Sequence, residues 1–274
     1  LWEISYPHSL GLLYSAFTFY CGFKVNSGEY KLMGLAPYGE PKYLNLILEK
    51  LIDLKDDGSY KLNMKYFKFH RGLKMISSAF IKLFGKKPRQ PDEKITKFYM
   101  DVASSIQKAI EIIVIKIAKN LHSETKLDNL CLAGGVALNC VANGKILDEA
   151  GFKDIWIQPS AGDAGSSLGS ALIYHFYSKN NRKINKNDSM KSAYLGPSFT
   201  DSQIIKFLDD KKIPFQTLTP EKIDNLVSDY LSMGNVIGWF QGRMEFGPRA
   251  LGNRSIIGDP RIKDMQKKMN LKIK

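Results

Sequence analysis

Two glycine-rich turns carry residues whose types and spacing could hold a phosphate. Each turn follows an apolar run, residues 130–133 and residues 155–158, and each precedes a helical pattern. Gly134 and Gly135 form the first turn, and Asp163 lies in the second. A buried strand that ends in such a turn presents the unpaired N–H groups of the next helix to an anion. Glycines allow the close approach because they carry no side chain.

A purely structural interpretation of the two turns stays open. Strand, small-residue turn and helix recur throughout α/β proteins simply to pack a helix on a sheet. Neither turn has the Walker or the dinucleotide glycine spacing, which disfavours an ordinary P-loop or Rossmann site. Two turns in succession, with Asn139 on the first helix and no basic neighbour in sequence for Asp163, favour a nucleotide site. A cation or a ribose hydroxyl is then the expected partner of Asp163.

A second set of candidates lies in the stretch GRMEFGPRALGNRSIIGDPR. Arg243, Arg249 and Arg254 stand there among glycines and prolines, where the backbone is held in defined turns. Guanidinium groups bind phosphate or carboxylate oxygens through two parallel donors, so the stretch predicts an oxyanion site. The alternative is that one or two of the arginines tie loops to the core through carbonyl oxygens and to Glu245 or Asp259.

Two charged residues stand in the turn-rich stretch of residues 26–39. Glu29 and Lys31 follow an Asn-Ser-Gly turn signal and precede a Pro-Tyr-Gly segment. Charged side chains in such a stretch are candidates for a site. A surface salt bridge between Glu29 and Lys31, or another neighbour, is the alternative.

The elements that must position these residues follow from apolar spacing. Apolar residues at nearly every position predict an element buried on most sides over residues 10–23. Apolar side chains three and four residues apart predict a long amphipathic helix from Lys97 to near His122. The other expected elements are a helix over residues 43–54, a helix that ends at Gly151, a helix capped by Thr200 and Gln203, a helix from Thr219 to Gly234 and a strand over residues 236–240.

The composition is that of a globular chain whose positive charge is concentrated in three segments. The 274 residues are 44% hydrophobic and carry a formal net charge of +13. Residues 60–90 have nine Lys or Arg and no acid, residues 179–192 five against one, and residues 260–274 six against one, so the remainder of the chain sums to −5. Solvated lysine-rich loops explain such segments more often than an acidic partner does. Nucleic-acid binding is therefore not expected.

The sequence predicts a cytoplasmic protein without a transmembrane helix or a secretory signal. Charge interrupts every apolar stretch well before bilayer length. Cys21, Cys131 and Cys140 have neither a zinc nor a disulfide spacing, so they are expected to be core thiols in a reducing compartment. The chain starts Leu-Trp-Glu without an initiator methionine, which predicts a piece of a longer protein.

Five motifs occur in an order that resembles a known family. They are PHSLGLLYSAFTFYCGFKVNSGEYKLMGLAPYG, LAGGVALNCVANGKI, PSAGDAGSSLGSAL, YLGPSFTD and GWFQGRMEFGPRALGNRSI. In this order they closely resemble the O-carbamoyltransferases of the NodU, CmcH and TobZ type. The resemblance runs through nearly the whole chain and is weakest over residues 60–90 and over the polar stretch 179–192, a predicted linker.

The resemblance implies an α/β protein with two domains. Residues 1–178 would be a partial actin-like ATPase domain (ASKHA, ribonuclease H-like), residues 179–192 the linker, and residues 193–274 the start of an incomplete YrdC-like α/β domain. In the family the YrdC-like domain uses ATP and carbamoyl phosphate to make carbamoyladenylate. The actin-like domain then transfers the carbamoyl group to a hydroxyl of a small natural-product or sugar substrate, with a divalent metal, iron or Mg, holding the intermediate.

The resemblance also implies roles for the candidate residues. Lys31 and Asp163 would be catalytic, Lys31 by stabilising charge on the carbamoyl carbonyl and Asp163 as a metal ligand. The family's metal histidines would precede residue 1, and its C-terminal domain would continue past Lys274. The nucleotide-binding residues would be Gly11, Glu29, Gly134, Gly135 and Asn139, and the carbamoyl-phosphate or adenylate site would be Arg243, Arg249 and Arg254.

Two other functions stay open at this point. A carbamoyl transferase of the tRNA-modifying or hydrogenase-maturation type could use the basic segments, but the acylphosphatase-like or zinc-finger segment that would favour it is not found in the sequence. The third possibility is a non-catalytic nucleotide-binding module. Activity is expected of the full-length protein rather than of this chain alone.

Overall fold

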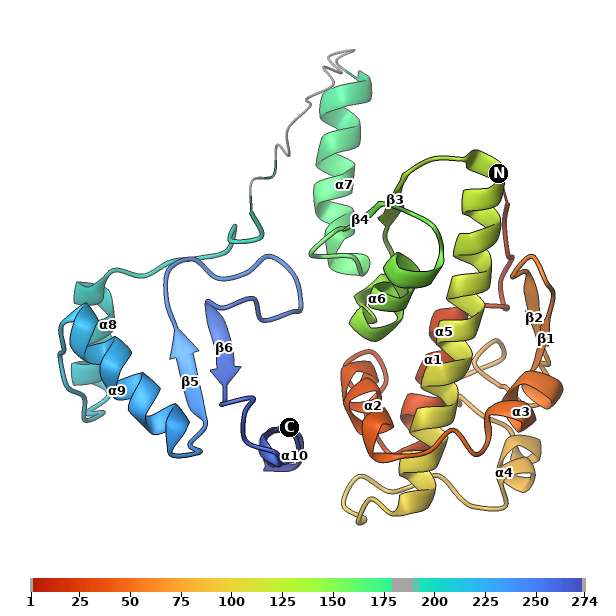
Figure 1. The fold of residues 1–274 in the computed structure, drawn as a ribbon, viewed down its shortest axis with the longest axis horizontal. Coiled ribbons are helices and arrows are strands. Elements are labelled where there is room, and N and C mark those ends of the chain that lie inside the picture. Colours follow the sequence, from red (N-terminus) through yellow and green to blue (C-terminus); the bar gives the residue numbers. More distant parts are fainter. Residues whose placement is uncertain (1, 179–189, 191, 273–274) are drawn as a thin grey trace. The chain divides into compact units, whose positions relative to one another are not determined.

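The chain forms two compact units of mixed helix and strand, residues 1–157 and 158–274 (Figure 1). The structure, a computed structural model, describes residues 2–178, 190 and 192–272. The predicted linker, residues 179–192, lies outside the described residues except for 190 and 192. The division after residue 157 does not coincide with the predicted domain end at residue 178, and the predicted domain boundaries stay a prediction. No residue of the helix over Ser166–Ile173, which follows the division, is buried.

The first unit contains one long helix surrounded by short elements. Its elements are α1 Leu10–Tyr20, α2 Glu29–Leu35, η1 Ala36–Tyr38, α3 Leu44–Leu46, η2 Ile47–Leu51, β1 Ile52–Leu54, β2 Tyr60–Leu62, α4 Ser78–Phe84, α5 Lys97–Thr125, β3 Asn129–Leu132, η3 Gly135–Leu138, α6 Cys140–Glu149 and β4 Asp154–Ile157. β1 and β2 form an antiparallel pair. β3 and β4 are parallel, with Leu130 opposite Ile155 and α6 as the crossover.

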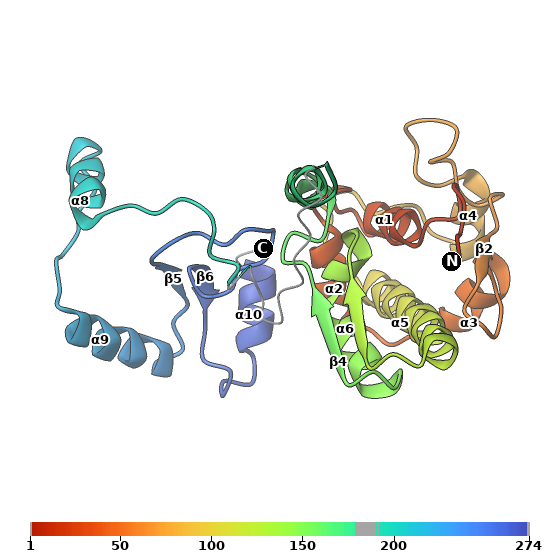
Figure 2. The same cartoon turned by 90° about the horizontal axis from the view of Figure 1, so that it is seen from above.

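The core of the first unit forms where α5 packs against α1, α2 and α6 (Figures 1 and 2). Ile106, Ile110 and Ile113 of α5 are buried at the three- and four-residue spacing that predicted this helix. Phe17 of α1 contacts Phe80 of α4 edge to face, with ring centroids 5.2 Å apart. The long amphipathic helix and the buried N-terminal element are therefore confirmed.

Arg89 closes the carboxyl end of α1. The side chain is buried, its Nε donates to the carbonyl oxygen of Cys21 at 2.7 Å, and its Nη2 donates to that of Gly22 at 3.1 Å. A guanidinium at this position satisfies carbonyl groups at the helix end, which have no partner within the helix. One of the nine cations in residues 60–90 thus has a structural task.

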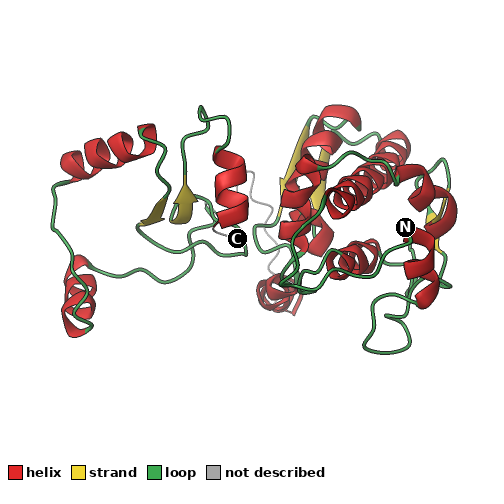
Figure 3. Ribbon diagram, turned by 90° about the horizontal axis from the view of Figure 1, so that it is seen from below, coloured by secondary structure: helices red, strands yellow, loops and turns green. Residues whose placement is uncertain are grey.

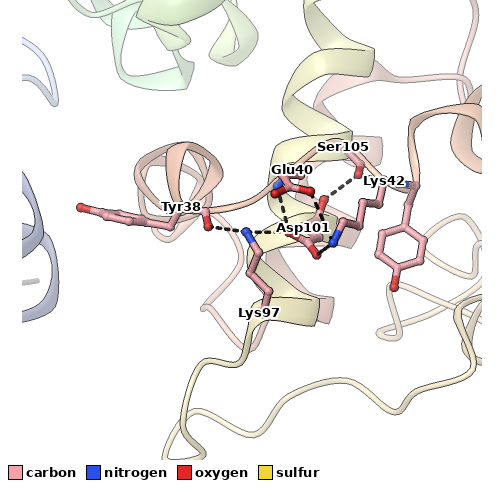
Figure 4. A network of polar contacts seen from close by, with 7 residues as sticks. Tyr38, Glu40, Lys42, Lys97, Asp101 and Ser105 are labelled. Carbon is pink, nitrogen blue, oxygen red and sulfur yellow. Dashed lines mark hydrogen bonds and ion pairs between the residues drawn. The ribbon is translucent and has the colours of Figure 1, made fainter.

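Asp101 of α5 holds the segment that follows η1 (Figure 4). Its carboxylate accepts a hydrogen bond from Glu40 N–H at 2.8 Å and faces the ammonium groups of Lys97 at 3.2 Å and Lys42 at 3.5 Å. Burial raises the pKa of Asp101, but the Glu40 N–H and the two lysines together hold it below its ordinary value. One turn along α5, Ser105 Oγ accepts from the N–H of Tyr43 at 2.9 Å.

The second unit has few buried side chains. Its elements are β-strands β5 Ile237–Phe240 and β6 Arg254–Ile257, paired antiparallel, with η4 Asp163–Gly165, α7 Ser166–Ile173, η5 Tyr174–Ser178, α8 Asp201–Asp210, α9 Pro220–Ser232 and α10 Met265–Lys272. Figure 3 shows the predominance of helix in the chain. The predicted capping box of Thr200 and Gln203 is present at the start of α8. Ala161 and Met265 are the buried apolar residues of the described part of this unit.

Two predictions about local structure are wrong. Residues 43–54 are not one helix, because the chain leaves η2 after Leu51 and Ile52 pairs with Leu62 in the β1–β2 hairpin. The cysteines are not all core thiols, since only Cys21 is buried, whereas Cys131 and Cys140 are exposed. Burial raises the pKa of the Cys21 thiol.

Candidate functional site

The first glycine turn has the geometry of an anion-binding loop. Gly134 takes φ +97°, a left-handed conformation that favours glycine, and directs the chain from β3 into η3. The N–H groups of Gly135 and Val136, at the start of η3, donate to no other group among the described residues. A Cβ added at Gly134 or Gly135 would have no other atom within 4 Å. The turn therefore combines N–H groups that have no partner among the described residues with open space beside its glycines, two features that a phosphate site requires.

Two other predicted nucleotide-binding residues are connected with this turn through α1. Gly11 of α1 lies beside the turn, and Glu29 is bonded to α1. A Cβ on Gly11 of α1 would be 3.6 Å from Cγ2 of Val136, which places Gly11 beside the turn. Glu29 of α2 is held by α1, because Ser15 Oγ donates to its Oε1 at 2.8 Å. The same oxygen accepts from Asn26 N–H at 3.0 Å, so Glu29 closes the preceding turn and forms no ion pair with Lys31.

Asn139 caps α6 from a buried position. Its Oδ1 accepts from Ala142 N–H at 3.1 Å and from Gln107 Nε2 at 3.2 Å, and its Nδ2 donates to Gln107 Oε1 at 3.0 Å. The side chain is 8% exposed. Asn139 thus supports the turn from the protein side, and its predicted contact with a nucleotide stays a prediction.

Gln107 and Glu111 are the members of this region that the sequence prediction missed. They lie one turn apart on α5, and both are buried on the apolar side of the helix. A signal was present in the sequence, because polar residues interrupt the apolar face between Ile106 and Ile113. Buried polar side chains on such a face require hydrogen-bonding partners.

Lys31 and Asp163, the predicted catalytic residues, both have side chains available for a ligand. Lys31 is half-buried on α2, and its ammonium group has no hydrogen bond or ion pair within the described part of the chain. Asp163 begins η4 in the second unit, where its exposed carboxylate has no hydrogen bond or ion pair within the described part of the chain. The two residues belong to different units.

The second glycine turn and the arginine loop meet within the second unit. Gly247 takes φ +124°, and a Cβ there would lie 2.7 Å from the carbonyl carbon of Pro159. The backbone before Asp163 and the loop that carries Arg249 are therefore in direct contact. Only glycine permits this approach, because any side chain would overlap the Pro159 carbonyl.

Two of the three arginines bind backbone carbonyl oxygens. Arg243 donates to Gly196 O and Leu195 O, both at 3.0 Å. Arg254 donates to Gln241 O at 2.6 Å and lies over the ring of Phe240 with its Cζ 3.5 Å from the centroid. This is the alternative that the sequence left open, and the anion-binding role of the arginines stays a prediction.

Glu245 organises the arginine loop from a buried position. Its Oε1 accepts from Leu251 N–H at 2.7 Å, Asn253 N–H at 2.8 Å and Arg254 N–H at 3.2 Å. These donors, the Leu251 N–H foremost, lower the pKa of Glu245 to about 2, although burial opposes the shift. The carboxylate therefore stays charged and holds the turn between residues 250 and 254.

Neither a metal cluster nor a membrane-spanning helix is found in the described part of the chain. No three His, Cys, Asp or Glu side chains among the described residues lie close enough to hold a metal ion. Asp163 alone does not fit a complete metal site. No helix in residues 2–178 or 192–272 is both long and apolar enough to cross a bilayer.

Comparison with known proteins defines the class of this chain. The family described as Carbamoyltransferase N-terminus matches residues 1–172, and the family described as Carbamoyltransferase C-terminus matches residues 228–274. The first match covers more than half of the sequence. The chain therefore belongs to the carbamoyltransferase family, and the predicted resemblance is confirmed.

Individual relatives support the same assignment. An uncharacterized protein of Synechocystis is 57% identical over the whole chain, which covers 45% of that relative. The nodulation protein NolO of Bradyrhizobium diazoefficiens is 36% identical over 99% of the chain and 47% of its own length. The 3'-hydroxymethylcephem-O-carbamoyltransferase of Streptomyces clavuligerus is 29% identical over 47% of the chain and 23% of its own length. The chain thus spans less than half the length of each of these relatives.

Proposed function

We propose that the protein to which this chain belongs is an ATP-dependent O-carbamoyltransferase that acts on a hydroxyl group of a small natural product or sugar. Membership of the carbamoyltransferase family supports the transferred group. The observation that carries ATP dependence is the open turn at Gly134 and Gly135, whose free N–H groups suit a nucleotide phosphate. The name of the Streptomyces relative, which specifies O-carbamoyl transfer to a hydroxymethylcephem, supports a small acceptor.

The proposed reaction has two steps. Carbamoyl phosphate gives up its phosphate with the uptake of one water, and the resulting carbamate oxygen attacks the α-phosphorus of ATP, so that pyrophosphate leaves and carbamoyladenylate forms. The acceptor hydroxyl then attacks the carbamoyl carbon, loses its proton, and AMP leaves. Both steps develop negative charge on oxygens, which fixed cations and N–H groups stabilise.

The proposal assigns roles to candidate residues of both units, and it assigns Arg249 and Arg254 together with Arg243 to the carbamoyl-phosphate or adenylate site. Lys31 stabilises charge on the carbamoyl carbonyl, and the turn at Gly134 and Gly135, together with Gly11 and Glu29, holds the nucleotide. Arg243 retains Nη1 donors that bond no described residue, which is compatible with an anion at the arginine loop. Asp163 is assigned as one ligand of a divalent metal, iron or Mg. No step is derived through the metal, because the described residues do not make a complete site.

The proposal extends to domains and location. Residues 1–178 are assigned to an actin-like domain and residues 193–274 to the start of a YrdC-like domain, in a cytoplasmic enzyme that does not bind nucleic acid. Exposed cations of residues 60–90, such as Lys65 and Lys68, are the feature that an RNA-directed carbamoyl transferase would use. A small-molecule acceptor is preferred because the Streptomyces relative is named for one.

The decisive experiment measures the conversion of ATP to AMP and pyrophosphate by the full-length protein. We expect AMP to form only when carbamoyl phosphate is present, and the Arg249→Ala variant to form at least tenfold less, because a guanidinium that stabilises a transferring anion contributes strongly to the rate. Arg71→Ala is the matched control, since Arg71 is exposed in the basic segment. It should keep the wild-type rate.

The possible outcomes separate the competing functions. A folded full-length protein that binds ATP and makes no AMP would be a nucleotide-binding module, and the transferase proposal would fail. AMP formation without carbamoyl phosphate would point to a different acyl donor. Loss of activity in both arginine variants would remove the support for a specific role of Arg249.

A further inference from the structure

A chain of buried polar groups crosses the apolar interior of the first unit. Tyr14 of α1 donates its hydroxyl proton to Gln107 Oε1 at 2.9 Å. Gln107 exchanges two hydrogen bonds with Asn139, and its Nε2 also donates to Glu111 Oε1 at 3.1 Å. Glu111 Oε2 in turn lies 2.8 Å from Lys145 Nζ on α6. The chain of contacts therefore joins α1, α5 and α6.

Gln107 is the centre of this network. The side chain is 5% exposed, and both atoms of its amide are engaged, Oε1 by Tyr14 and Asn139 and Nε2 by Glu111 and Asn139. A buried amide without partners is costly, and a buried network is stable only when its members are satisfied. The positions of Asn139 and Gln107 are therefore fixed relative to each other.

Asn139 also bonds the glycine turn, so it connects Gln107 with that turn. Its N–H donates to Val136 O at 3.0 Å, and its Oδ1 caps the first turn of α6. The hydrogen bonds of Asn139 thus connect the segment from Gly134 to Asn139 with Gln107. The open N–H groups of Gly135 and Val136 lie within this same segment.

We infer that Gln107 is a positioning residue for the phosphate-binding turn. It acts through Asn139 and has no contact with the nucleotide. Asn139 caps α6 through its bond with Ala142 N–H, and it is hydrogen-bonded to Gln107 of α5. The inference rests on the proposed function, because the turn is taken to bind the phosphates of ATP. The connection between Gln107 and the turn depends only on the hydrogen bonds through Asn139.

The first test compares Gln107→Met with Ser105→Ala in the full-length protein. Methionine keeps the length and helix preference of glutamine but cannot make its hydrogen bonds. Ser105→Ala is the matched control, because Ser105 is buried on the same helix but bonds Tyr43 N–H and not the turn. We expect ATP binding, measured by calorimetry on folded protein, to weaken roughly tenfold in Gln107→Met, the equivalent of about one hydrogen bond, and to stay unchanged in Ser105→Ala.

A second readout does not depend on ATP. The amide protons of Ala137 and Asn139 are bonded to Gly134 O and Val136 O, so their hydrogen exchange reports the order of the turn. We expect both to exchange faster in Gln107→Met than in the wild type and to be unchanged in Ser105→Ala. If Gln107→Met does not fold, Tyr14→Phe removes one hydrogen bond to Gln107 and should raise the same two exchange rates by a smaller factor.

The two readouts distinguish failure of the inference from failure of the proposed function. If the wild type does not bind ATP, the proposed function fails, and the exchange rates alone decide the role of Gln107. Equal exchange at Ala137 and Asn139 in the wild type and in both network variants would overturn the inference. Equal loss of ATP affinity in Gln107→Met and Ser105→Ala would also overturn it, since the effect would then be one of general stability.

Discussion

Glu245 shows how a single carboxylate organises a loop that is rich in cations. The arginines around it suggest ion pairs, but its Oε1 binds three main-chain N–H groups instead. Main-chain donors are fixed in direction, whereas arginine side chains are free to turn toward other acceptors. The consequence is that Arg243 and Arg254 are left to bind carbonyl oxygens of neighbouring loops.

The charge of Glu245 makes the loop sensitive to acid. Its pKa in the folded chain is about 2, below the ordinary value of 4.5, so the stabilisation is complete above pH 4.5 and is lost as the pH falls toward 2. We expect the amide proton shifts of Leu251 and Asn253, followed by NMR, to titrate with a midpoint near 2. A midpoint near 4.5 would contradict the buried hydrogen-bonded carboxylate. In Glu245→Gln the same protons should show no titration.

At single residues, the sequence does not predict which group of the chain a polar side chain will bind. Asn139 and Arg254 are predicted ligand-binding residues, which stays a prediction, and the structure shows that each makes several hydrogen bonds within the chain. Their partners, Gln107 and carbonyl oxygens of residues 241 and 242, come from other parts of the chain. Amide and guanidinium groups suit a ligand and a carbonyl oxygen equally well, so residue type alone cannot choose between them.

Among the elements, α5 connects three parts of the first unit. Near its start Asp101 and Ser105 bind the segment after η1, and in its middle Gln107 and Glu111 bind α6. Further along, Ile115 belongs to the apolar cluster that includes Leu130 of β3. A helix with polar contacts on successive turns fixes the register of its neighbours, which apolar contacts alone specify less strictly.

The approach of the segment after η1 to α5 depends on Gly39. A Cβ at this position would overlap the backbone of Met100, which cannot move without breaking the helix. We expect Gly39→Ala to lower the free energy of unfolding by about 2 kcal/mol or more, measured by urea denaturation.

Gly72→Ala is the control for this substitution. Gly72 has no other atom within 4 Å of an added Cβ, so its replacement should change the free energy of unfolding by less than about 0.5 kcal/mol. Equal unfolding midpoints for the two variants would show that the segment tolerates a side chain at residue 39. The contact with Asp101 would then be looser than the structure indicates.

Elements with strong local signals could be predicted from the sequence. The apolar spacing of α5, the capping box of α8 and the glycine stop after α6 each have a local cause. The end of η2 has no such local cause, because the apolar residues Ile52 and Leu54 continue a spacing that fits a helix equally well. Their strand conformation depends on pairing with Leu62 and Tyr60, a tertiary contact that overrides local preference.

At the scale of the whole chain, the two units differ in how much apolar surface they bury. The two apolar clusters of buried residues both lie in the first unit, from Leu10 to Phe152. In the second unit the amphipathic helices α8 and α9 have no buried residue, and Phe207 remains 57% exposed. Burial of apolar surface is the main term that offsets the loss of chain entropy on folding. The units should therefore differ in stability when they are separated.

Separate expression of residues 1–157 and 158–274 tests this difference. We expect the first fragment to unfold in one cooperative urea transition, because its core lies entirely within it. The second fragment should bind the dye ANS and unfold without a sharp transition, since α8 and α9 leave apolar faces uncovered.

The variant Phe207→Lys of the second fragment is a further check. Phe207 is exposed, so it can be replaced without loss of a core contact, and the variant should bind less ANS at unchanged helix content. A cooperative transition of the second fragment with no ANS binding would mean that its helices cover one another more fully than their exposure indicates.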